Sequence, residues 1–362
     1  MAIYVDHTHV GRHVTGLERI TLELFSPAAL APLDIVPLTA GNTAQMVMTQ
    51  TMGLPMRLAL GSNTLLCPGF PPSPLLRPFA SRVLPYIHDV FLLSRPHDLN
   101  LRARLYMAPP FKLALRTYPR FLTNSRDTQR KLAAHCRSDA SITLYRPPVR
   151  NVFGLSAGDR ATRPNDQLRL VALGTVEPRK NFIAAARIIN ALRAQGYPRA
   201  TLDIVGRDGW GDDHAALKEC PGVNLHGYQP TERVRELLDA ADIFICTSHE
   251  EGLGLPLLEA QYAGLPIVAP EAPIFQEVLD TSGILIDPNE PSLAAARIVS
   301  EVSDPNWRSR FASLAARNLR RWNALAHQDR GAVIDLIASI SRSGARAAAA
   351  ARGSRLAGHR DA

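Results

Sequence analysis

The residues best suited to do chemistry gather in one short segment, 248–260. It contains two glutamates, Glu251 and Glu259, with seven residues between them. The residues that follow Glu251 are Gly252, Leu253, Gly254, Leu255 and Pro256. Glycine lets the backbone approach a ligand closely, and proline suits the first turn of a helix. We therefore predict a helix from about Pro256, with Glu259 in its first turn and the amides of residues 253–255 at its N-terminus. Amides bind phosphate oxygens and carboxylates accept hydrogen bonds from hydroxyls, so the pattern suits a sugar diphosphate.

A second candidate site consists of two basic residues that follow another predicted strand. Arg179 and Lys180 come after the apolar stretch 168–173 and the turn residue Gly174, directly before a helical pattern. Cations at a helix entrance after a glycine turn suit a pyrophosphate. An ordinary solvated Arg–Lys pair is the alternative interpretation.

Three more candidates stand at or after the ends of predicted strands, and a fourth, Gly16, lies where the first predicted helix begins. The first three are His88, Gly206 and Tyr228. A structural histidine or a plain turn between a strand and a helix is the alternative for each. His7, His9 and His13 raise a metal hypothesis, but no carboxylate or cysteine stands at ligand spacing from them.

The elements that must position these residues alternate between strands and helices. In the second half, β-like runs fall at 168–173, 202–205, 242–246, 267–269 and 284–286, and helical patterns at 182–192, 231–238 and 256–263. In the first half, the sequence predicts a strand at 3–6 and a helix at 15–25 with a Thr15–Glu18 capping box. A proline-rich loop is predicted at 61–78. Strand ends are predicted at 85–89 and 121–123, and Ser125 is predicted to begin a helix. Such alternation predicts parallel sheets with helices on both faces.

The chain length of 362 residues suits two domains. We place the first at 1–155 and the second at 156–325, with the polar segment 155–167 as linker. A helix follows at 326–341, and the Ala/Gly/Ser/Arg-rich residues 342–362 are expected to be a disordered basic tail.

Composition excludes several classes of protein. With 46% hydrophobic and 20% charged residues, the chain is that of an ordinary globular protein, and no apolar run approaches the ~20 residues of a membrane helix. The four cysteines show no disulfide or zinc spacing, which fits a reducing cytoplasm. The net charge of the chain is +8, and residues 342–362 carry five arginines against one acid. This tail could attract anionic lipid or nucleic acid, or it could be a solvated segment without a partner.

The run Glu-Gly-x-Gly-Leu-Pro-x-x-Glu from Glu251 to Glu259 resembles the donor signature of family 4 retaining glycosyltransferases. The similarity extends to Gly174–Asn181, to the His88-Asp89 pair and to Thr15–Arg19, and covers the chain up to about residue 340. The resemblance implies an α/β fold with two Rossmann-like doubly wound domains facing across a cleft (GT-B). It also implies that the helix at 326–341 packs back on the N-terminal domain.

The resemblance implies roles for the candidate residues. Lys180 would contact the diphosphate, Glu251 the sugar and Glu259 the ribose, while His88 would lie near the transferred sugar. Gly16 would approach the donor phosphate, and Gly206 and Tyr228 would lie in loops that hold the base. The family often has an arginine directly after the glycine, where this chain has Thr175, and Arg179 would compensate. No Asp-x-Asp motif occurs, so neither a metal nor another cofactor is expected.

The implied reaction is transfer of a hexose, with mannose among the candidates, from a nucleotide-diphosphate sugar to a glycan or lipid-linked acceptor. It would serve surface polysaccharide or lipopolysaccharide synthesis in the cytoplasm, with peripheral contact to anionic lipid at the inner face of the cell membrane and no nucleic-acid partner. An epimerase, a phosphorylase and a non-catalytic sugar-nucleotide-binding subunit remain alternatives.

Overall fold

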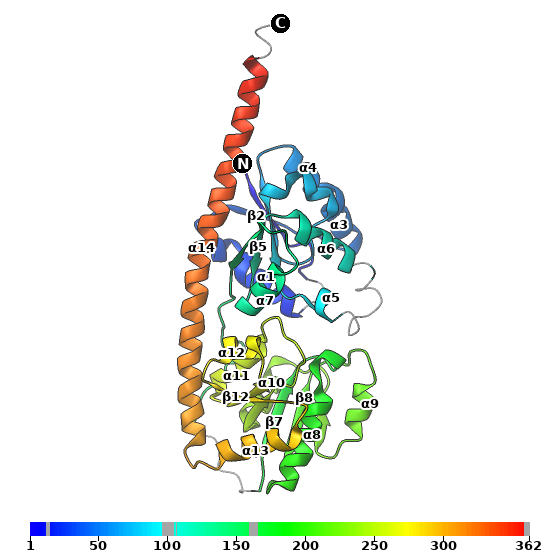
Figure 1. Ribbon diagram of the computed structural model, residues 1–362, viewed down its shortest axis with the longest axis vertical. Helices are drawn as coiled ribbons and strands as arrows, with labels where there is room; N and C mark the ends of the chain where they lie inside the picture. Colours follow the sequence, from blue (N-terminus) through cyan, green and yellow to red (C-terminus); the bar gives the residue numbers. More distant parts are fainter. Residues whose placement is uncertain (12–14, 96–104, 106, 159–165, 358–362) are drawn as a thin grey trace. The chain divides into compact units, whose positions relative to one another are not determined.

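The computed structural model describes residues 1–11, 15–95, 105, 107–158 and 166–357. The chain forms two compact units (Figure 1). The first combines Met1–Pro148 with Leu325–Ala362, and the second is Val149–Ala324.

The first unit is built on a six-stranded sheet. Its strands are β1 (Ile3–Asp6), β2 (Ile35–Leu38), β3 (Thr64–Cys67), β4 (Val83–Ile87), β5 (Arg120–Thr123) and β6 (Ser141–Leu144). Their order is β2-β1-β3-β4-β5-β6, and every described pairing is parallel. The carboxyl ends of all these strands therefore meet at one edge, which is where parallel α/β sheets bind ligands.

Short helices accompany this sheet. They are α1 (Thr15–Phe25), α2 (Pro27–Leu30), α3 (Thr43–Met48), the π-turn η1 (Thr49–Gly53), α4 (Leu54–Ala59), the 3-10 helix η2 (Pro74–Arg82), α5 (Phe91–Ser94), α6 (Ala108–Thr117) and α7 (Arg126–Ala133). Ser125 caps α7 as predicted, because its Oγ accepts the Thr128 N–H at 3.1 Å.

The prediction of a loop over residues 61–78 is wrong. Strand β3 lies inside that range, and all four of its residues are buried. The prolines that suggested a loop begin only at Pro68, after the strand has ended. A short apolar run can form a central strand when the sheet buries both of its faces.

The second unit repeats the architecture. Its strands are β7 (Arg169–Leu173), β8 (Thr201–Val205), β9 (Val223–Leu225), β10 (Ile243–Ile245), β11 (Ile267–Pro270) and β12 (Gly283–Ile286). The order is β12-β11-β10-β7-β8-β9, again with parallel pairing throughout the described strands. The two parallel sheets confirm the predicted α/β class.

The helices of the second unit follow its strands. They are the 3-10 turn η5 (Pro178–Lys180), α8 (Phe182–Ala194), α9 (Asp213–Lys218), α10 (Thr231–Ala240), α11 (Leu255–Ala260), the 3-10 turn η6 (Gln261–Ala263), α12 (Pro273–Leu279), α13 (Pro291–Val302) and α14 (Trp307–Ala357). The apolar spacing predicted for α8 is confirmed, since Phe182, Ala185, Ala186, Ile189 and Leu192 are all buried in the core of this unit.

The boundary between the units falls between Pro148 and Val149, earlier than the expected linker at 155–167, of which residues 159–165 lie outside the described part of the chain. The backbone of Val149 explains this position. Its N–H donates to Asn323 Oδ1 at 2.7 Å, and its carbonyl accepts from Tyr262 Oη at 2.9 Å. These bonds tie the chain to the second unit from Val149 onward.

Helix α14 is longer than expected and contributes to both units, passing to the first at Leu325. In the first unit, its Asp329 pairs with Arg146 at 2.7 Å and its Ser341 lies 3.1 Å from Thr64 Oγ1. Residues 342–357 continue the helix, where we expected a disordered tail. The run of five alanines at 347–351 explains the difference, because alanine has the highest helix propensity.

Candidate active site

The segment with the two glutamates follows β10 at the carboxyl edge of the second sheet. Strand β10 ends at Ile245, and α11 begins at Leu255. Gly254 stands between them with φ of 77°, in the left-handed region that favours glycine. A Cβ at this position would also lie 2.7 Å from Leu257 Cδ1. Glycine is therefore required for the loop to turn into the helix at this point.

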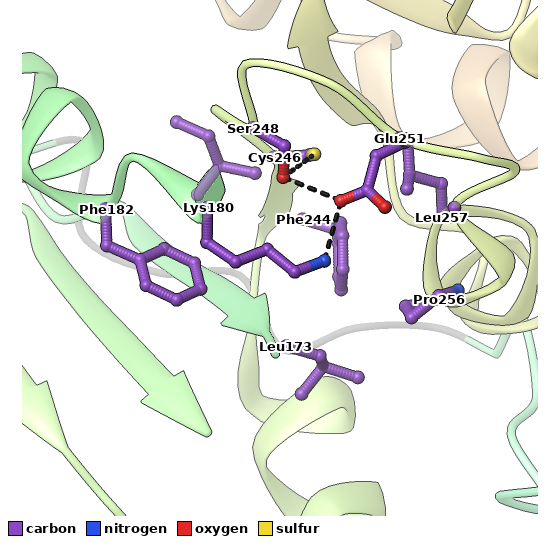
Figure 2. A pocket seen from close by; sticks show the side chains of 11 residues that line it. Leu173, Lys180, Phe182, Phe244, Cys246, Ser248, Glu251, Pro256 and Leu257 are labelled. Atoms are coloured by element: carbon purple, nitrogen blue, oxygen red, sulfur yellow. Dashed lines mark hydrogen bonds and ion pairs between the residues drawn. The ribbon is translucent and has the colours of Figure 1, made fainter. Parts of the chain in front are cut away.

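Lys180 and Glu251 form the centre of the site. Lys180 Nζ donates to Glu251 Oε1 at 2.6 Å, so the end of β7 and the end of β10 are joined by an ion pair. Figure 2 shows the lysine side chain extended toward this carboxylate. Ser248 Oγ donates to the same Oε1 atom at 2.7 Å. The pocket around the pair is lined largely by apolar side chains, among them Leu173, Phe182, Phe244 and Leu257.

Arg179 adds a second positive charge. Its guanidinium lies 3.3 Å from Glu251 Oε2 and 2.6 Å from Glu177 Oε1. It also donates to the Glu250 carbonyl at 3.0 Å. The charge of Arg179 thus acts on the same carboxylate as Lys180, although Thr175 occupies the place where the family often has an arginine.

The electrostatics of Glu251 follow from this arrangement. Burial raises the pKa of its carboxyl, since a charge is unfavourable away from water. The positive charges of Lys180 and Arg179, together with the hydrogen bonds from Lys180 and Ser248, outweigh that effect and leave the pKa below its ordinary value of 4.5. Glu251 is therefore ionised at neutral pH, and can accept hydrogen bonds from hydroxyl groups.

The loop that follows β7 and carries Lys180 packs against the loop after β8, which in turn packs against the loop after β9. The Gly174 N–H donates to the Val205 carbonyl at 2.9 Å, and the Gly206 N–H donates to the Gly227 carbonyl at 2.9 Å. A Cβ at Gly206 would lie 1.8 Å from the Gly174 carbonyl oxygen. Backbone packing of this kind explains a glycine at position 206, whether or not a ligand binds there.

Tyr228 lies in the loop after β9 and is 64% exposed. The Arg207 guanidinium lies over its ring, 4.9 Å from the centroid. An exposed ring supported by a cation offers a flat face for stacking. The loops after β10, β7, β8 and β9 therefore bring Glu251, Lys180, Gly206 and Tyr228 to the same edge of one sheet.

The predicted place of Glu259 in the first turn of its helix is wrong. Helix α11 begins at Leu255, so Glu259 lies in the second turn, and it is buried. The helix starts one residue earlier than predicted because Gly254, not Leu255, makes the turn into it. The side chains of Leu253 and Leu255 are buried as well, so these two residues could reach a ligand only through their backbone.

His88 and Gly16 belong to the first unit, and their predicted roles stay predictions. Burial, together with the neighbouring His9, lowers the pKa of His88 to about 4, although its hydrogen bond to the Pro68 carbonyl opposes this. The distance from His88 Nε2 to that carbonyl is 2.6 Å. Because a carbonyl only accepts, Nε2 must carry the proton, and Nδ1 is the acceptor of a neutral ring.

Gly16 is the exposed second residue of α1. The expected capping box cannot be judged, since the Thr15 side chain lies outside the described residues. Glu18 accepts the Gly11 N–H at 2.6 Å. No group of three His, Cys, Asp or Glu side chains is placed to hold a metal ion within the described residues, and His13 lies outside them.

Sequence reasoning missed two residues of the site. Ser248 and Glu177 lie within the segments 248–260 and 174–181 but have no predicted role, yet Ser248 donates to Glu251, and Arg179 donates to Glu177. Glu177 is two residues from Arg179 in a tight turn, and this spacing of opposite charges was the available signal. Nothing local in the sequence indicated that the Ser248 hydroxyl would meet the Glu251 carboxylate.

The chain is similar to known proteins in sequence and in fold. Residues 159–318 match the family described as Glycosyl transferases group 1. The O-antigen chain mannosyltransferase B of Escherichia coli is 33% identical over 142 residues, which cover 38% of this chain and 37% of that protein. The chain spans less than two thirds of the length of this and the next most similar curated relatives.

Solved structures share the fold. Sucrose-phosphate synthase from Thermosynechococcus elongatus superposes with a TM-score of 0.64 at 16% identity, over 94% of this chain and 100% of that one. HepE from Anabaena, solved with UDP and glucose, gives a TM-score of 0.61 at 17% identity, over 94% and 98%. The fold is thus that of the GT-B glycosyltransferases.

Proposed function

We propose that the protein is a glycosyltransferase that moves a hexosyl group from a nucleotide-diphosphate sugar to an acceptor. The observation that carries this proposal is the partly buried ion pair of Lys180 and Glu251, 2.6 Å apart, in the loops that follow β7 and β10. The cation can bind the phosphate oxygens of a sugar diphosphate, and the ionised carboxylate can accept hydrogen bonds from the sugar hydroxyls. The match of residues 159–318 to the family described as Glycosyl transferases group 1 supports the same reaction class.

In this proposal the two cations stabilise the departing diphosphate. Negative charge grows on the diphosphate as the bond to the sugar breaks, so fixed positive groups lower the energy of the transition state. Lys180 exchanges its bond with Glu251 for one with a phosphate oxygen, and Arg179 remains beside it. Glu251 then accepts hydrogen bonds from the sugar hydroxyls, and Glu259 is assigned to the ribose.

We further propose transfer with retention of the anomeric configuration, without a metal ion. Family resemblance favours a front-face attack, in which the leaving phosphate takes the acceptor proton. Similarity to an O-antigen chain mannosyltransferase makes mannose the first sugar to test. A glycan or a lipid-linked acceptor in surface polysaccharide or lipopolysaccharide synthesis, at the inner face of the cell membrane, is proposed on the same basis.

Thermal unfolding in the presence of UDP, GDP, ADP and their hexose conjugates tests the donor site. A ligand at a hundredfold excess over its Kd should stabilise the folded protein by about 2.7 kcal/mol. Lys180→Met should weaken the effective nucleotide at least about tenfold, because it removes a charge-assisted hydrogen bond. Lys218→Met is a matched control, since this exposed lysine lies on α9 in the same unit.

Product analysis then tests the reaction. Incubation with the sugar nucleotide and an acceptor should give a glycoside of unchanged anomeric configuration by NMR, and a chelator should not reduce the rate. If no nucleotide stabilised the folded protein, the proposed donor site would be wrong. If a nucleotide bound but no acceptor was glycosylated, a non-catalytic binding subunit would be the better description.

A further inference from the structure

The two basic residues of the site are held in different ways. The Arg179 guanidinium lies between two carboxylates, 2.6 Å from Glu177 Oε1 and 3.3 Å from Glu251 Oε2. It also donates to the Glu250 carbonyl at 3.0 Å. The Lys180 ammonium lies 2.6 Å from Glu251 Oε1 and meets no other acceptor in the part of the chain that the structure describes. A lysine that turned toward a ligand would give up one bond, whereas the arginine would give up several.

The backbone fixes Arg179 as well. Its carbonyl accepts the His249 N–H at 2.9 Å, which bonds the loop after β7 to the loop after β10. Two residues further along, the buried Thr247 hydroxyl donates to the Asn181 carbonyl at 2.8 Å. Arg179 is thus bonded to the loop after β10 through its backbone and through its side chain. Moving its guanidinium toward a ligand would break bonds that join the two loops.

Glu177 makes a change of partner by Arg179 costly. This carboxylate is buried, and Arg179 pairs with it. Removing the partner of a buried charge is strongly destabilising. If Arg179 turned to a diphosphate, Glu177 and Glu251 would both lose a cation. Lys180 can leave at a smaller cost, because Glu251 keeps Arg179 and the hydrogen bond from Ser248 Oγ at 2.7 Å.

Glu251 depends most on a cation when a donor is bound. Burial raises the pKa of its carboxyl, and Lys180 and Arg179 together lower that pKa below its ordinary value. Once a diphosphate bonds Lys180, negative charge stands near Glu251, and like charges disfavour the ionised form. Arg179 is then the cation that still opposes burial and keeps the carboxylate ionised for the sugar hydroxyls.

We propose that Arg179 is a positioning residue, which Glu177 holds in place and which in turn holds Glu251 for the transferred sugar, while Lys180 bonds the diphosphate. This division of roles rests on the proposed function, since it needs a donor whose diphosphate takes Lys180. Arg179 contributes its charge from a fixed position and bonds no phosphate oxygen. It therefore does not replace the arginine that the family often has where this chain has Thr175.

Titration calorimetry of the full chain tests these roles with three pairs of ligands: GDP with GDP-mannose, UDP with UDP-glucose and ADP with ADP-glucose. The pair that the wild type binds is then titrated into the variants. Arg179→Gln should weaken binding of the nucleotide sugar at least about tenfold, because Glu251 is no longer held for the sugar. Arg233→Gln is the control and should bind as the wild type does, since Arg233 belongs to an exposed ion pair with Glu236 on α10.

A double-mutant cycle with Glu251→Gln shows whether Arg179 acts through that carboxylate. If it does, adding Arg179→Gln to Glu251→Gln should change the Kd of the nucleotide sugar less than about threefold. Lys180→Met in the same background should still weaken the nucleoside diphosphate at least about tenfold, because it removes a bond to phosphate.

Arg179→Lys separates the position of the charge from its sign. Lysine keeps the charge, but a single nitrogen must replace the two that bond Glu177 and Glu251. Binding of the nucleotide sugar should therefore fall at least about fivefold and kcat should fall with it, while the Kd of the nucleoside diphosphate stays within about threefold of the wild type. This variant also serves if Arg179→Gln fails to fold because Glu177 lacks its cation.

Two results would overturn the positioning role. The first is a loss of nucleoside diphosphate binding of at least about tenfold on adding Arg179→Gln to both the wild type and Glu251→Gln, which would show that Arg179 bonds the diphosphate itself. The second is unchanged nucleotide-sugar binding in Arg179→Gln and Arg179→Lys. Both results leave the donor site standing, whereas a wild type that bound none of these ligands would overturn the proposed function together with this role.

Discussion

At the scale of single residues, the site is a compact set of two cations and two carboxylates. Glu177, Arg179, Lys180 and Glu251 compensate one another. The two carboxylates of this set are buried, and removing a cation leaves a buried charge without its partner. In the proposed function, a diphosphate would therefore compete with Glu251 for Lys180. The ion pair holds the lysine extended at the strand ends before a donor binds.

The pKa of His88 gives a prediction at the same scale. It is about 4 in the folded protein, below its ordinary value of 6.5, so the unfolded chain binds the proton more readily. Stability should be complete above about pH 6.5 and should fall as the pH drops toward 4, by at most about 3 kcal/mol. Urea unfolding across this range measures the loss.

His88→Gln should flatten that pH dependence in part. It cannot remove all of it, because burial also lowers the pKa of His7. The exposed His135→Gln variant is the control and should keep the wild-type profile. If His88→Gln kept the wild-type dependence of stability on pH, the pKa of His88 would not be lower in the folded chain than in the unfolded chain.

At the scale of elements, the site depends on how closely the loops after β7 and β8 approach each other. Gly206→Ala would place a methyl group 1.8 Å from the Gly174 carbonyl oxygen, and the two loops would have to separate. We expect a loss of about 1–3 kcal/mol in stability by urea unfolding, together with weaker nucleotide binding.

A second glycine provides the comparison for this prediction. A Cβ at Gly331, inside α14, meets no atom within 4 Å. Gly331→Ala should therefore stabilise the protein, by about 0.5–1 kcal/mol, because alanine favours the helix. Equal effects of the two substitutions would contradict the idea that position 206 is constrained by its neighbouring loop.

At the scale of the whole molecule, the first unit is assembled from two distant parts of the chain. Val333, Ile337 and Ile340 of α14 are buried, and Asp329 pairs with Arg146. A chain that ends at Ala324 would lose these contacts, and its first unit should fail to fold. Hydrogen exchange by mass spectrometry should then show rapid exchange in β1, β3 and β4.

Removal of residues 346–362 alone should change the free energy of unfolding by less than about 0.5 kcal/mol, because it leaves these contacts intact. Native-like protection of residues 1–148 in the chain that ends at Ala324 would show that α14 is dispensable for the first unit.

The sequence by itself determined the features that depend on local patterns. The spacing of apolar residues predicted α8, alternating strands and helices predicted two parallel α/β units, and glycine, proline and charge next to strand ends indicated Lys180, Arg179 and Glu251. These signals are local because side-chain periodicity and turn chemistry operate over a few residues.

Only the tertiary structure decided which of these residues meet. Strand order places β7 next to β10 although 69 residues separate the end of β7 at Leu173 from the start of β10 at Ile243, and this brings Lys180 to Glu251. The burial of β3, the bond from Ser248 to Glu251 and the return of α14 to the first unit likewise depend on contacts between distant segments. Such contacts leave no local trace in the sequence, because packing between elements selects them.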